Sequence, residues 1–432
     1  MGEGFAVNIG HARWYRIGLL LFLMYLTAFV DRSNIGMAAP AMVKSFGLSS
    51  TAVGVLLSAF FWGYVITMVP AGWTVSRYSA KKVIIWALVV WSIMAILTGV
   101  VTSFNALLVV RFLMGLAEGV VWPAFSIVIV NWFPDHERGR AMNFSELSLP
   151  VSAIIMAPLA GWMIHTWNYH VMFILQGLPP LIMAGLFAWL GSDSPEKDRL
   201  ISNTERTYIM ERMASERKTQ VQSDEGTIWN VLGNYRIWIL GVIYFLWING
   251  FYSFGLWMPT LLKQLSGKGI QVVGWLSAVP FVLAVVAMLI NSALSDRWRL
   301  KRMWFVAVPL LIGGFGLVTE HFIGFGLGIN MLVLIISGIG IYAAFGPWWA
   351  WSVSFVPKNQ AGSANGLINL LGNFGGITGP IIVGIAAHGK NVINGFYILG
   401  FGIVAAAIVA IIFGIIVRSR ASADNQRPLS LE

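Results

Sequence analysis

Twelve apolar stretches, each about 20 residues long, limit the folds open to this 432-residue chain. A stretch of that length allows one helix to cross the hydrocarbon core of a membrane. Hydrophobic residues make up 57% of the chain and charged residues only 11%, which excludes a soluble protein built around one core. The stretches cover residues 15–38, 52–75, 83–103, 105–130, 140–165, 171–191, 236–260, 272–294, 303–320, 327–352, 362–388 and 393–418. The sequence therefore predicts an all-α membrane protein with twelve transmembrane helices.

The longest polar interruption divides these stretches into two equal sets. It covers residues 192–235 and is rich in charged side chains. Six stretches precede it and six follow, and such an equal division is typical of the internal repeats of secondary transporters. We therefore predict an N-terminal six-helix half (1–191), a cytoplasmic linker (192–235) and a C-terminal six-helix half (236–432). The two halves are expected to be pseudo-symmetric bundles.

The lysine and arginine residues predict how the helices are oriented in the membrane. If the N-terminus is cytoplasmic, 22 of the 28 basic residues fall in cytoplasmic segments, four in outer loops and two within the spans. Because basic residues are enriched on the cytoplasmic side, we expect both termini in the cytoplasm and the protein in an inner or plasma membrane. The first span is expected to stay uncleaved. The net charge of +10 then reflects membrane topology, and no nucleic-acid partner is expected.

Several kinds of chemistry are excluded by what the sequence lacks. The chain has no cysteine, which rules out disulfides, iron–sulfur clusters and thiolate zinc sites. It has no phosphate-binding loop of the G-x-x-x-x-G-K-[ST] kind, no evident nucleophile–base pair and no evident cluster of metal ligands. None of its six histidines lies in the middle of a span. We expect a protein that is not an enzyme, needs no cofactor or metal, and works as a monomer.

Two arginines and two acids lie inside the first and fourth apolar spans. Asp31 and Arg32 are in the first span, and Arg111 and Glu118 are in the fourth. A charge near the bilayer centre costs about 2.5–3.5 kcal/mol on insertion scales, so such residues usually serve a function. Arg111 and Glu118 are seven residues apart and share one face of a helix. We interpret the four residues as an anion site with proton-binding carboxylates, and the alternative is that they only neutralise one another.

The balance of these charges predicts coupled transport. The two arginines and two carboxylates sum to zero, so a bound anion would leave one negative charge uncompensated. Protonation of one carboxylate restores the balance, so an anion and a proton should bind cooperatively, as symport requires. Glu146, in the fifth span, is a third acid. It is predicted to reach a cytoplasmic vestibule, to act as a second proton site, or to pair with a loop arginine.

Three segments resemble signatures of the major facilitator superfamily. Residues 72–82 (GWTVSRYSAKK) are similar to its loop signature G-x-L-x-D-R-x-G-R-K. Residues 111–119 (RFLMGLAEG) are similar to its fourth-helix motif R-F-x-x-G-x-x-E. Residues 132–141 (WFPDHERGRA) are similar to its W-F-P-x-x-E-R-x-x-A loop. The resemblance implies the twelve-helix fold of that superfamily.

Three further segments resemble one branch of it, the anion:cation symporter family. They are residues 25–34 (YLTAFVDRSN), 345–350 (FGPWWA) and 365–380 (NGLINLLGNFGGITGP). That family includes bacterial galactonate and hexuronate transporters, the animal protein sialin and the vesicular glutamate carriers. Each motif alone is weak, but six motifs in the same order make the resemblance specific.

The resemblance implies roles for individual residues. Asp31 and Glu118 match the acids that take protons, Arg32 matches the ligand of the substrate carboxylate, and Arg111 matches the arginine coupled to the acids. Further positions match residues that contact substrate or face the cavity, and they are Tyr64, Asn369 and Asn373. Guanidinium groups suit carboxylate binding, and Tyr and Asn side chains can bond sugar hydroxyls. Trp348 is a further candidate, because its tryptophan cluster lies within the tenth span.

The chain also departs from the family pattern. Ser76 and Ser79 replace the aspartate and a glycine of the loop signature, which weakens the expected cytoplasmic latch of the first half. Phe29 stands where members that carry sugar acids often have tyrosine, and Glu146 stands where small or amide residues are usual. These changes leave fewer hydroxyl contacts, so a smaller or more apolar carboxylate stays open as the substrate.

The sequence thus predicts a proton-coupled symporter that imports an organic anion by alternating access. The substrate is expected to be a sugar acid, such as an aldonate or hexuronate, or another small carboxylate. Protons and the lipid bilayer are the other expected partners. Three alternatives remain at this point: an antiporter or uniporter of organic anions, a drug efflux carrier of the same fold, and a membrane sensor that binds its ligand without moving it.

Overall fold

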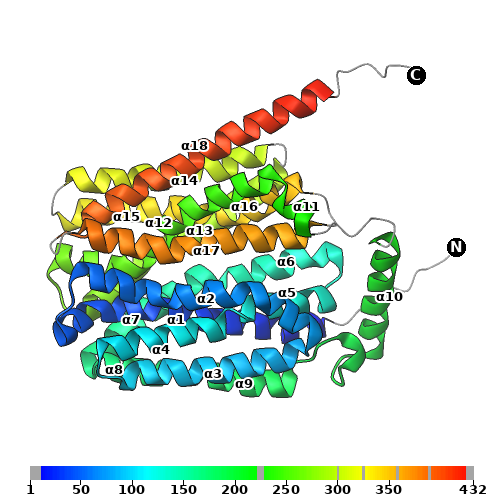
Figure 1. Cartoon of the computed structure of the whole chain (residues 1–432), viewed down its shortest axis with the longest axis horizontal. Coiled ribbons are helices and arrows are strands. Elements are labelled where there is room, and N and C mark those ends of the chain that lie inside the picture. Colours follow the sequence, from blue (N-terminus) through cyan, green and yellow to red (C-terminus); the bar gives the residue numbers. More distant parts are fainter. Residues whose placement is uncertain are drawn as a thin grey trace. The chain divides into compact units, whose positions relative to one another are not determined.

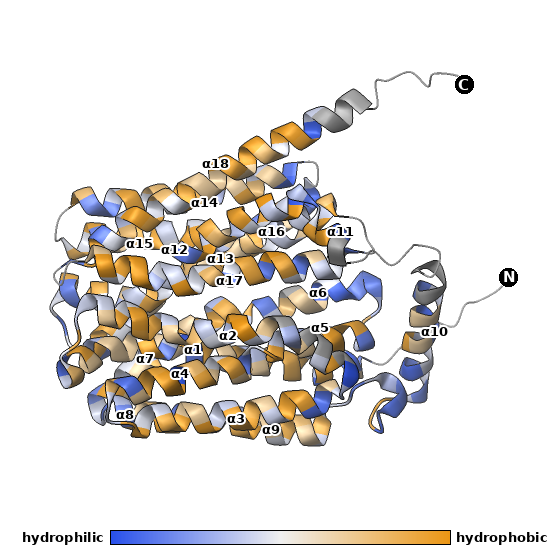
Figure 2. Ribbon diagram, in the orientation of Figure 1, coloured by the Kyte–Doolittle hydropathy of each residue, from blue (hydrophilic) through white to orange (hydrophobic). Residues whose placement is uncertain are grey.

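The computed structural model describes residues 11–220, 228–298, 301–323, 326–356, 360–387 and 391–424. Within these ranges the regular secondary structure is helical, with no strand. Twelve helical segments are long and apolar enough to cross a membrane, which confirms the predicted fold class. Figure 2 shows that apolar residues predominate along them. The following side chains used in the sequence analysis lie outside the described part: Ser76, Arg217, Lys218, Arg299, Lys358, Lys390, Arg420 and Arg427.

The first six spans follow the predicted stretches and extend beyond most of them (Figure 1). A short π-helical turn, η1 (Arg13–Gly18), leads into the first span. The helices are α1 (Leu19–Phe46), α2 (Ser50–Arg77), α3 (Ala80–Val100), α4 (Phe104–Glu118), α5 (Val121–Trp132), α6 (Asp135–Glu146), α7 (Ser148–Thr166), α8 (Tyr169–Gln176) and α9 (Leu178–Leu190). The pairs α4 and α5, α6 and α7, and α8 and α9 each form one span.

The last six spans are built in the same way. Their helices are α12 (Tyr235–Ser266), α13 (Ile270–Arg297), α14 (Arg302–Ile323), α15 (Leu327–Ala343), α16 (Phe345–Ser352), α17 (Ala361–Ala386) and α18 (Ile393–Asp424). Helices α15 and α16, together with the 3₁₀ turn η4 (Val353–Phe355), form the tenth span. Between the two sets lie η2 (Pro195–Lys197), α10 (Asn203–Gln220) and α11 (Ile228–Leu232).

Four spans are divided into two helices, and each division lies four or five residues before a proline. Proline has no backbone N–H to bond the carbonyl one turn earlier, and its ring crowds that carbonyl. In the four divided spans the first helix ends at Glu118, Glu146, Gln176 and Ala343. The prolines that follow are Pro123, Pro150, Pro180 and Pro347, respectively. Other prolines, such as Pro158, lie in unbroken helices. Three polar side chains therefore lie at helix ends inside spans.

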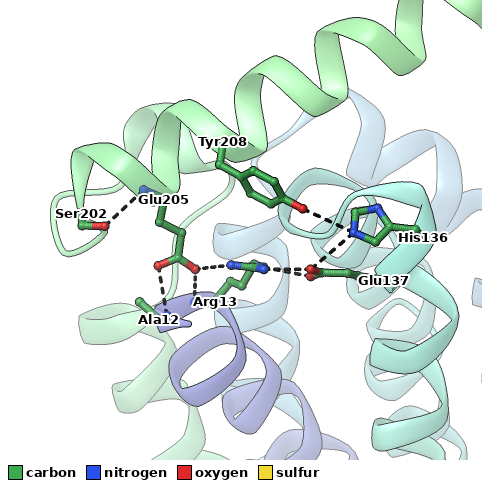
Figure 3. Close-up of polar contacts among 7 residues, drawn as sticks. All are labelled: Ala12, Arg13, His136, Glu137, Ser202, Glu205 and Tyr208. Atoms are coloured by element: carbon green, nitrogen blue, oxygen red, sulfur yellow. Dashed lines mark hydrogen bonds and ion pairs between the residues drawn. The ribbon is translucent and has the colours of Figure 1, made fainter. Parts of the chain in front are cut away.

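The linker helix α10 is bound to the start of the chain by buried charges. Glu205 accepts hydrogen bonds from the backbone N–H groups of Ala12 (3.0 Å) and Arg13 (3.1 Å) and pairs with the Arg13 guanidinium at 2.7 Å (Figure 3). Arg13 also pairs with Glu137, in the loop signature after the fourth span, at 2.8 Å. The side chains of Arg13 and Glu205 are only 3% and 0% exposed. We call Arg13, Glu137 and Glu205 the linker latch.

Further contacts hold the linker to the same region. Glu216, near the C-terminal end of α10, pairs with Arg138 at 2.9 Å and accepts a hydrogen bond from the backbone N–H of Asp135 at 2.7 Å. Asp198 pairs with Arg16 of η1 at 2.7 Å. The segment predicted only as a cytoplasmic linker is therefore an ordered part of the structure from residue 192 to residue 220.

The chain forms two compact units. Unit 1 is drawn from Met1–Asn34, Ala59–Ser152 and Thr166–Asp224, and unit 2 from Ile35–Ser58, Ala153–His165 and Glu225–Glu432. The division cuts through α1, α2 and α7 rather than between the sixth and seventh spans. It follows packing and does not test the predicted boundaries at residues 191 and 236, which stay a prediction.

Close helix contacts in unit 2 explain why parts of α1, α2 and α7 belong to it. A β-carbon at Gly36 of α1 would collide with the Leu256 carbonyl of α12, and one at Gly54 of α2 would collide with the Pro380 carbonyl of α17. Gly161 of α7 is similarly close to the backbone at Ile270 of α13. Small residues let the backbones of membrane helices approach closely. These three glycines therefore allow α1, α2 and α7 to pack closely against α12, α17 and α13, respectively.

Candidate functional site

The charged residues of the first and fourth spans come together in unit 1 as an ion pair between Arg32 and Glu118. The Arg32 guanidinium donates from Nε to Oε1 of Glu118 at 2.5 Å, and its Nη2 atom also contacts that oxygen. Glu118 is fully buried and Arg32 is 7% exposed. Oε2 of Glu118 has no hydrogen-bond partner among the described residues. One oxygen of the Glu118 carboxylate therefore binds Arg32, and the other is available for a hydrogen bond or a proton.

Aromatic rings surround the Arg32 guanidinium. Its central carbon lies 4.9 Å from the ring centre of Phe29 and 4.6 Å from that of Tyr64. The Phe60 ring centre is 5.5 Å away. Ring faces attract a cation and exclude water, which strengthens the interaction of the guanidinium with any carboxylate beside it. Phe29 thus contacts the guanidinium through its ring face, without a hydroxyl group.

Arg111 is held differently from Arg32. Its Nη1 atom donates to the backbone carbonyl of Asp31 at 3.5 Å and lies 3.5 Å from the sulfur of Met114. It forms no ion pair within 4.0 Å among the described residues, although its charge lies near enough to Asp31 and Glu118 to attract both. Its Nε atom has no hydrogen-bond partner in the same part of the chain. Arg111 is therefore a fully buried cation that compensates two acids without forming an ion pair with either carboxylate.

Asp31 is part of a hydrogen-bonded chain that reaches the sixth span. The Asn34 amide donates to Oδ1 of Asp31 at 3.2 Å and to Oε1 of Gln176 at 2.9 Å. The second oxygen of Asp31, Oδ2, has no hydrogen-bond partner within the described ranges. Asp31 itself is fully buried. Each predicted proton-binding acid thus has one oxygen that meets no hydrogen-bond criterion among the described residues, although the Trp91 indole lies near enough to Asp31 to interact with it.

Glu146 is close to the same group. It is the last residue of α6, where the span divides before Pro150, and its charge lies near enough to Arg32 and Tyr64 to interact with both. Its side chain is half-buried. It forms no ion pair with a loop arginine among the described residues. The charge of Glu146 thus lies near Arg32 and Tyr64, and which of its three predicted roles it has stays a prediction.

The contact between α2 and α4 sets the position of Tyr64 and Glu118. A β-carbon at Gly63 would collide with the Phe112 carbonyl, and one at Gly115 would collide with the Phe60 carbonyl. Because both glycines lack that atom, the two backbones touch. The residues that follow them on each helix, Tyr64 and Glu118, are thereby brought to the Arg32 side chain of α1. We call Asp31, Arg32, Tyr64, Arg111, Glu118 and Glu146 the charged cluster.

The predicted residues of the eleventh span lie in a polar network of unit 2. The Asn373 amide donates to the backbone and side-chain oxygens of Asn369, both at 2.9 Å, and the Tyr252 hydroxyl donates to Oδ1 of Asn373 at 3.3 Å. On the same helix, Thr378 donates to Oδ1 of Asn249 at 2.6 Å. These hydroxyl and amide groups can bond a hydroxylated molecule.

Trp348 is fully buried in unit 2. Its ring stacks on Tyr244 with ring centres 5.4 Å apart and meets Trp247 edge-on at 5.9 Å. Its indole N–H has no acceptor among the described residues. In this state the ring packs within unit 2, and its side chain leaves no exposed surface for a substrate.

Sequence reasoning missed Gln176 and the pair formed by Asn249 and Thr378. Each of the two amides is a polar residue inside an apolar span, and that feature alone marks a functional candidate in a membrane protein. Gln176 is buried and completes the chain from Asp31. Among the described residues there is no group of three or more His, Asp or Glu side chains placed to hold a metal ion.

Comparisons with known proteins agree with this architecture. The family model of the Major Facilitator Superfamily matches residues 21–380. A putative tartrate transporter of Agrobacterium vitis is 28% identical over 417 residues, covering 92% of this chain and 90% of that protein. A probable galactarate/D-glucarate transporter of Escherichia coli (strain K12) is 30% identical over 407 residues, covering 88% of each chain.

A solved structure shares the fold. The inward-open conformation of the xylose transporter of E. coli has a TM-score of 0.73 to this chain at 15% sequence identity, covering 92% of this chain and 95% of that one. Twelve spans, buried intramembrane charges and transporter relatives define a membrane transporter rather than an enzyme. The chain belongs to the Major Facilitator Superfamily.

Proposed function

We propose that this transporter carries a small organic anion together with protons, with Arg32 as the ligand of the substrate carboxylate. The observation that supports this proposal is the buried ion pair between Arg32 and Glu118. A carboxylate that binds Arg32 competes with Glu118 for the same guanidinium. Because Glu118 is fully buried, it can be released from Arg32 only if its charge is neutralised. Substrate binding and protonation of Glu118 are therefore linked.

Asp31 and Arg111 complete the charge balance in this mechanism. With both acids ionised, the two carboxylates and two guanidinium groups sum to zero, and a monovalent anion requires one added proton. A dicarboxylate requires a second, and Asp31 or Glu146 is then the second acceptor. Arg111 interacts with both Asp31 and Glu118, so its position changes the proton affinity of each acid.

The chemistry of the substrate is taken from the relatives and from the polar residues. Tartrate and galactarate or D-glucarate, named for two relatives, are hydroxylated dicarboxylates. We propose the same class here: a small carboxylate with hydroxyl groups. Tyr64, Asn369 and Asn373 remain candidate substrate contacts by resemblance to the anion:cation symporter family, and Trp348 remains one because its tryptophan cluster lies within the tenth span. Tyr252 is added to them because it bonds Asn373, and Asn249 and Thr378 are added because their hydrogen-bonded pair includes a residue of the same helix α17.

The orientation and location are part of the proposal. The basic residues support an inner or plasma membrane with both termini cytoplasmic. In that orientation the glycine contacts at Gly36, Gly54 and Gly161 lie near the outer ends of their helices. Contacts of this kind are what would close the outer side in alternating access, in which the site opens to one side at a time.

The first experiment loads purified protein into vesicles that contain a trapped pH dye. Tartrate, galactarate, glucarate, a monocarboxylate and xylose are then added outside at equal concentration. Acidification of the lumen with one class of carboxylate, and none with xylose, is the result expected of a proton-coupled symporter. Silence with every carboxylate, together with exchange of labelled anion, would favour an antiporter and overturn the coupling part of the proposal.

Variants separate anion binding from proton coupling. Arg32→Ala should abolish anion binding at every pH, because Arg111, the other arginine of the charged cluster, is fully buried beside Asp31 and Glu118. Glu118→Gln should keep exchange of labelled anion but lose uphill uptake, because the amide cannot take up a proton. The exposed Glu211 of α10 provides the matched control, and Glu211→Gln should leave both activities unchanged. Normal anion affinity in Arg32→Ala would show that the site has been placed wrongly.

A further inference from the structure

A cavity of about 610 Å³ lies on unit 1, away from the charged cluster. It is formed by the end of α2, the first half of α3 and the end of α4. On α4 its wall is made by Leu116 and Ala117, which are half-exposed, whereas Glu118 on the same helix is fully buried. The cavity is therefore on the outer surface of the helices and is separate from the proposed transport site.

The two ends of this groove differ in chemistry. Arg77, Tyr78, Ser79 and Lys82 line one end, and they lie where α2 stops and α3 begins. Apolar side chains line the rest, along Val83, Trp86, Ala87 and Val90 of α3 and Leu116, Ala117 and Val120. The Trp86 side chain is 69% exposed. A basic end at the membrane surface and an apolar wall running into the membrane match the two parts of a phospholipid.

The neighbouring lysine shows which charge is available. Lys81 is used within the protein: its backbone N–H donates to Asp193 at 2.8 Å and its ammonium donates to the Ala188 carbonyl at 2.7 Å. Ser79 donates to the same Asp193 carboxylate at 2.6 Å and caps the start of α3. Lys82 is exposed, and its ammonium has no ion pair or hydrogen bond among the described residues. Its charge is thus left to interact with an anion outside the protein.

We propose that this groove binds one anionic phospholipid. Its phosphate contacts Lys82 and Arg77, and an acyl chain lies between α3 and α4 against Trp86, Val90 and Ala117. Basic residues at this position face the cytoplasmic leaflet in the orientation predicted from the sequence, and that leaflet carries the anionic lipids. A soluble phosphate would satisfy only the basic end and leave the apolar wall uncovered, so a lipid is the occupant that matches both. The proposal does not depend on the identity of the transported anion.

The test measures lipid binding to delipidated full-length protein in detergent by native mass spectrometry. Dioleoyl phosphatidylglycerol is compared with dioleoyl phosphatidylcholine, which has the same chains and a neutral headgroup, and with glycerol phosphate, which has no chains. We expect one tight site for phosphatidylglycerol and weaker binding of the other two. Lys82→Gln should weaken the tight site about fivefold, the change expected from one basic residue beside an anionic headgroup.

Two matched controls accompany the variants. Lys44→Gln removes an equally exposed lysine far from the groove in sequence, and binding should stay as in the native protein. Ala117→Trp fills the groove, whereas Val109→Trp adds the same side chain at an exposed position of α4 outside it. Only Ala117→Trp should lose the tight site. Gel filtration and thermal unfolding check that each variant is folded, and Lys82→Gln remains informative if Ala117→Trp is not.

Several results would overturn the proposal. Equal binding of phosphatidylglycerol and phosphatidylcholine would show that the basic end of the groove does not select an anionic headgroup. Binding of glycerol phosphate as tight as that of the lipid would assign a soluble anion to the basic end instead. Unchanged lipid binding in Lys82→Gln would place the lipid elsewhere on the protein. The lipid-binding test does not measure transport. Its result therefore stands even if the proposed transport function is wrong.

Discussion

The linker latch allows a quantitative prediction about the stability of unit 1. Glu205→Ala removes one carboxylate that accepts two backbone hydrogen bonds and pairs with the buried Arg13 guanidinium. Breaking a buried ion pair by removing one partner costs about 3–5 kcal/mol. Arg13 keeps its second partner, Glu137, so we expect the lower end, about 3 kcal/mol. Glu205→Gln keeps a neutral acceptor for the backbone and should cost about 1–2 kcal/mol.

The assay is reversible unfolding in mixed micelles, with SDS as the denaturant and far-UV circular dichroism as the readout. Glu211→Ala is the matched control, because Glu211 is an exposed acid of the same helix. It should change the free energy of unfolding by no more than about 0.5 kcal/mol. Limited trypsin digestion at the basic residues of α10 should be faster in Glu205→Ala than in the control. The reasoning is refuted if Glu205→Ala is as stable and as resistant to trypsin as Glu211→Ala.

Two further predictions concern helix packing and a buried acid. Gly115→Ala places a methyl group against the Phe60 carbonyl and should destabilise the protein by about 1–3 kcal/mol. Gly185→Ala, in open space on α9, should be close to neutral, and equal thermal midpoints for the two variants would contradict the packing argument. Glu320 of α14 is fully buried and neither carboxylate oxygen has a partner among the described residues, so Glu320→Leu should stabilise by about 1–3 kcal/mol. A lower thermal midpoint for Glu320→Leu would show that this acid has an unrecognised favourable contact.

The number and position of the spans could be predicted from the sequence because the membrane imposes a length and a composition. The same reasoning found the charged residues, since a charge in an apolar stretch stands out. It could not find the partner of Glu118. Helical spacing puts Arg111 and Glu118 on one face, yet the ion pair forms with Arg32 of another span. That choice depends on how α1, α2 and α4 pack, and glycines such as Gly115 set this packing without any chemical signal of their own.

The linker shows the same limit in another way. Its charged sequence predicts a cytoplasmic segment. The sequence does not reveal that Glu205 binds Arg13, because the two residues are 192 positions apart. Polar residues inside spans, such as Gln176 and Asn249, carried a readable signal that was overlooked. The ion pairs between residues far apart in the chain have no corresponding signal in the sequence.

The position of the linker latch has a consequence for how the protein is made. Arg13 leaves the ribosome 192 residues before Glu205, a delay of about 10–40 s at the usual rates of synthesis. During that time six spans are made while Arg13 lacks its partner from α10. Unit 1 therefore becomes complete only after the linker has emerged, although the linker lies outside the membrane. A first half expressed on its own would have to extend through Gln220, rather than stop after the sixth span, to retain the ion pairs between the linker and the start of the chain.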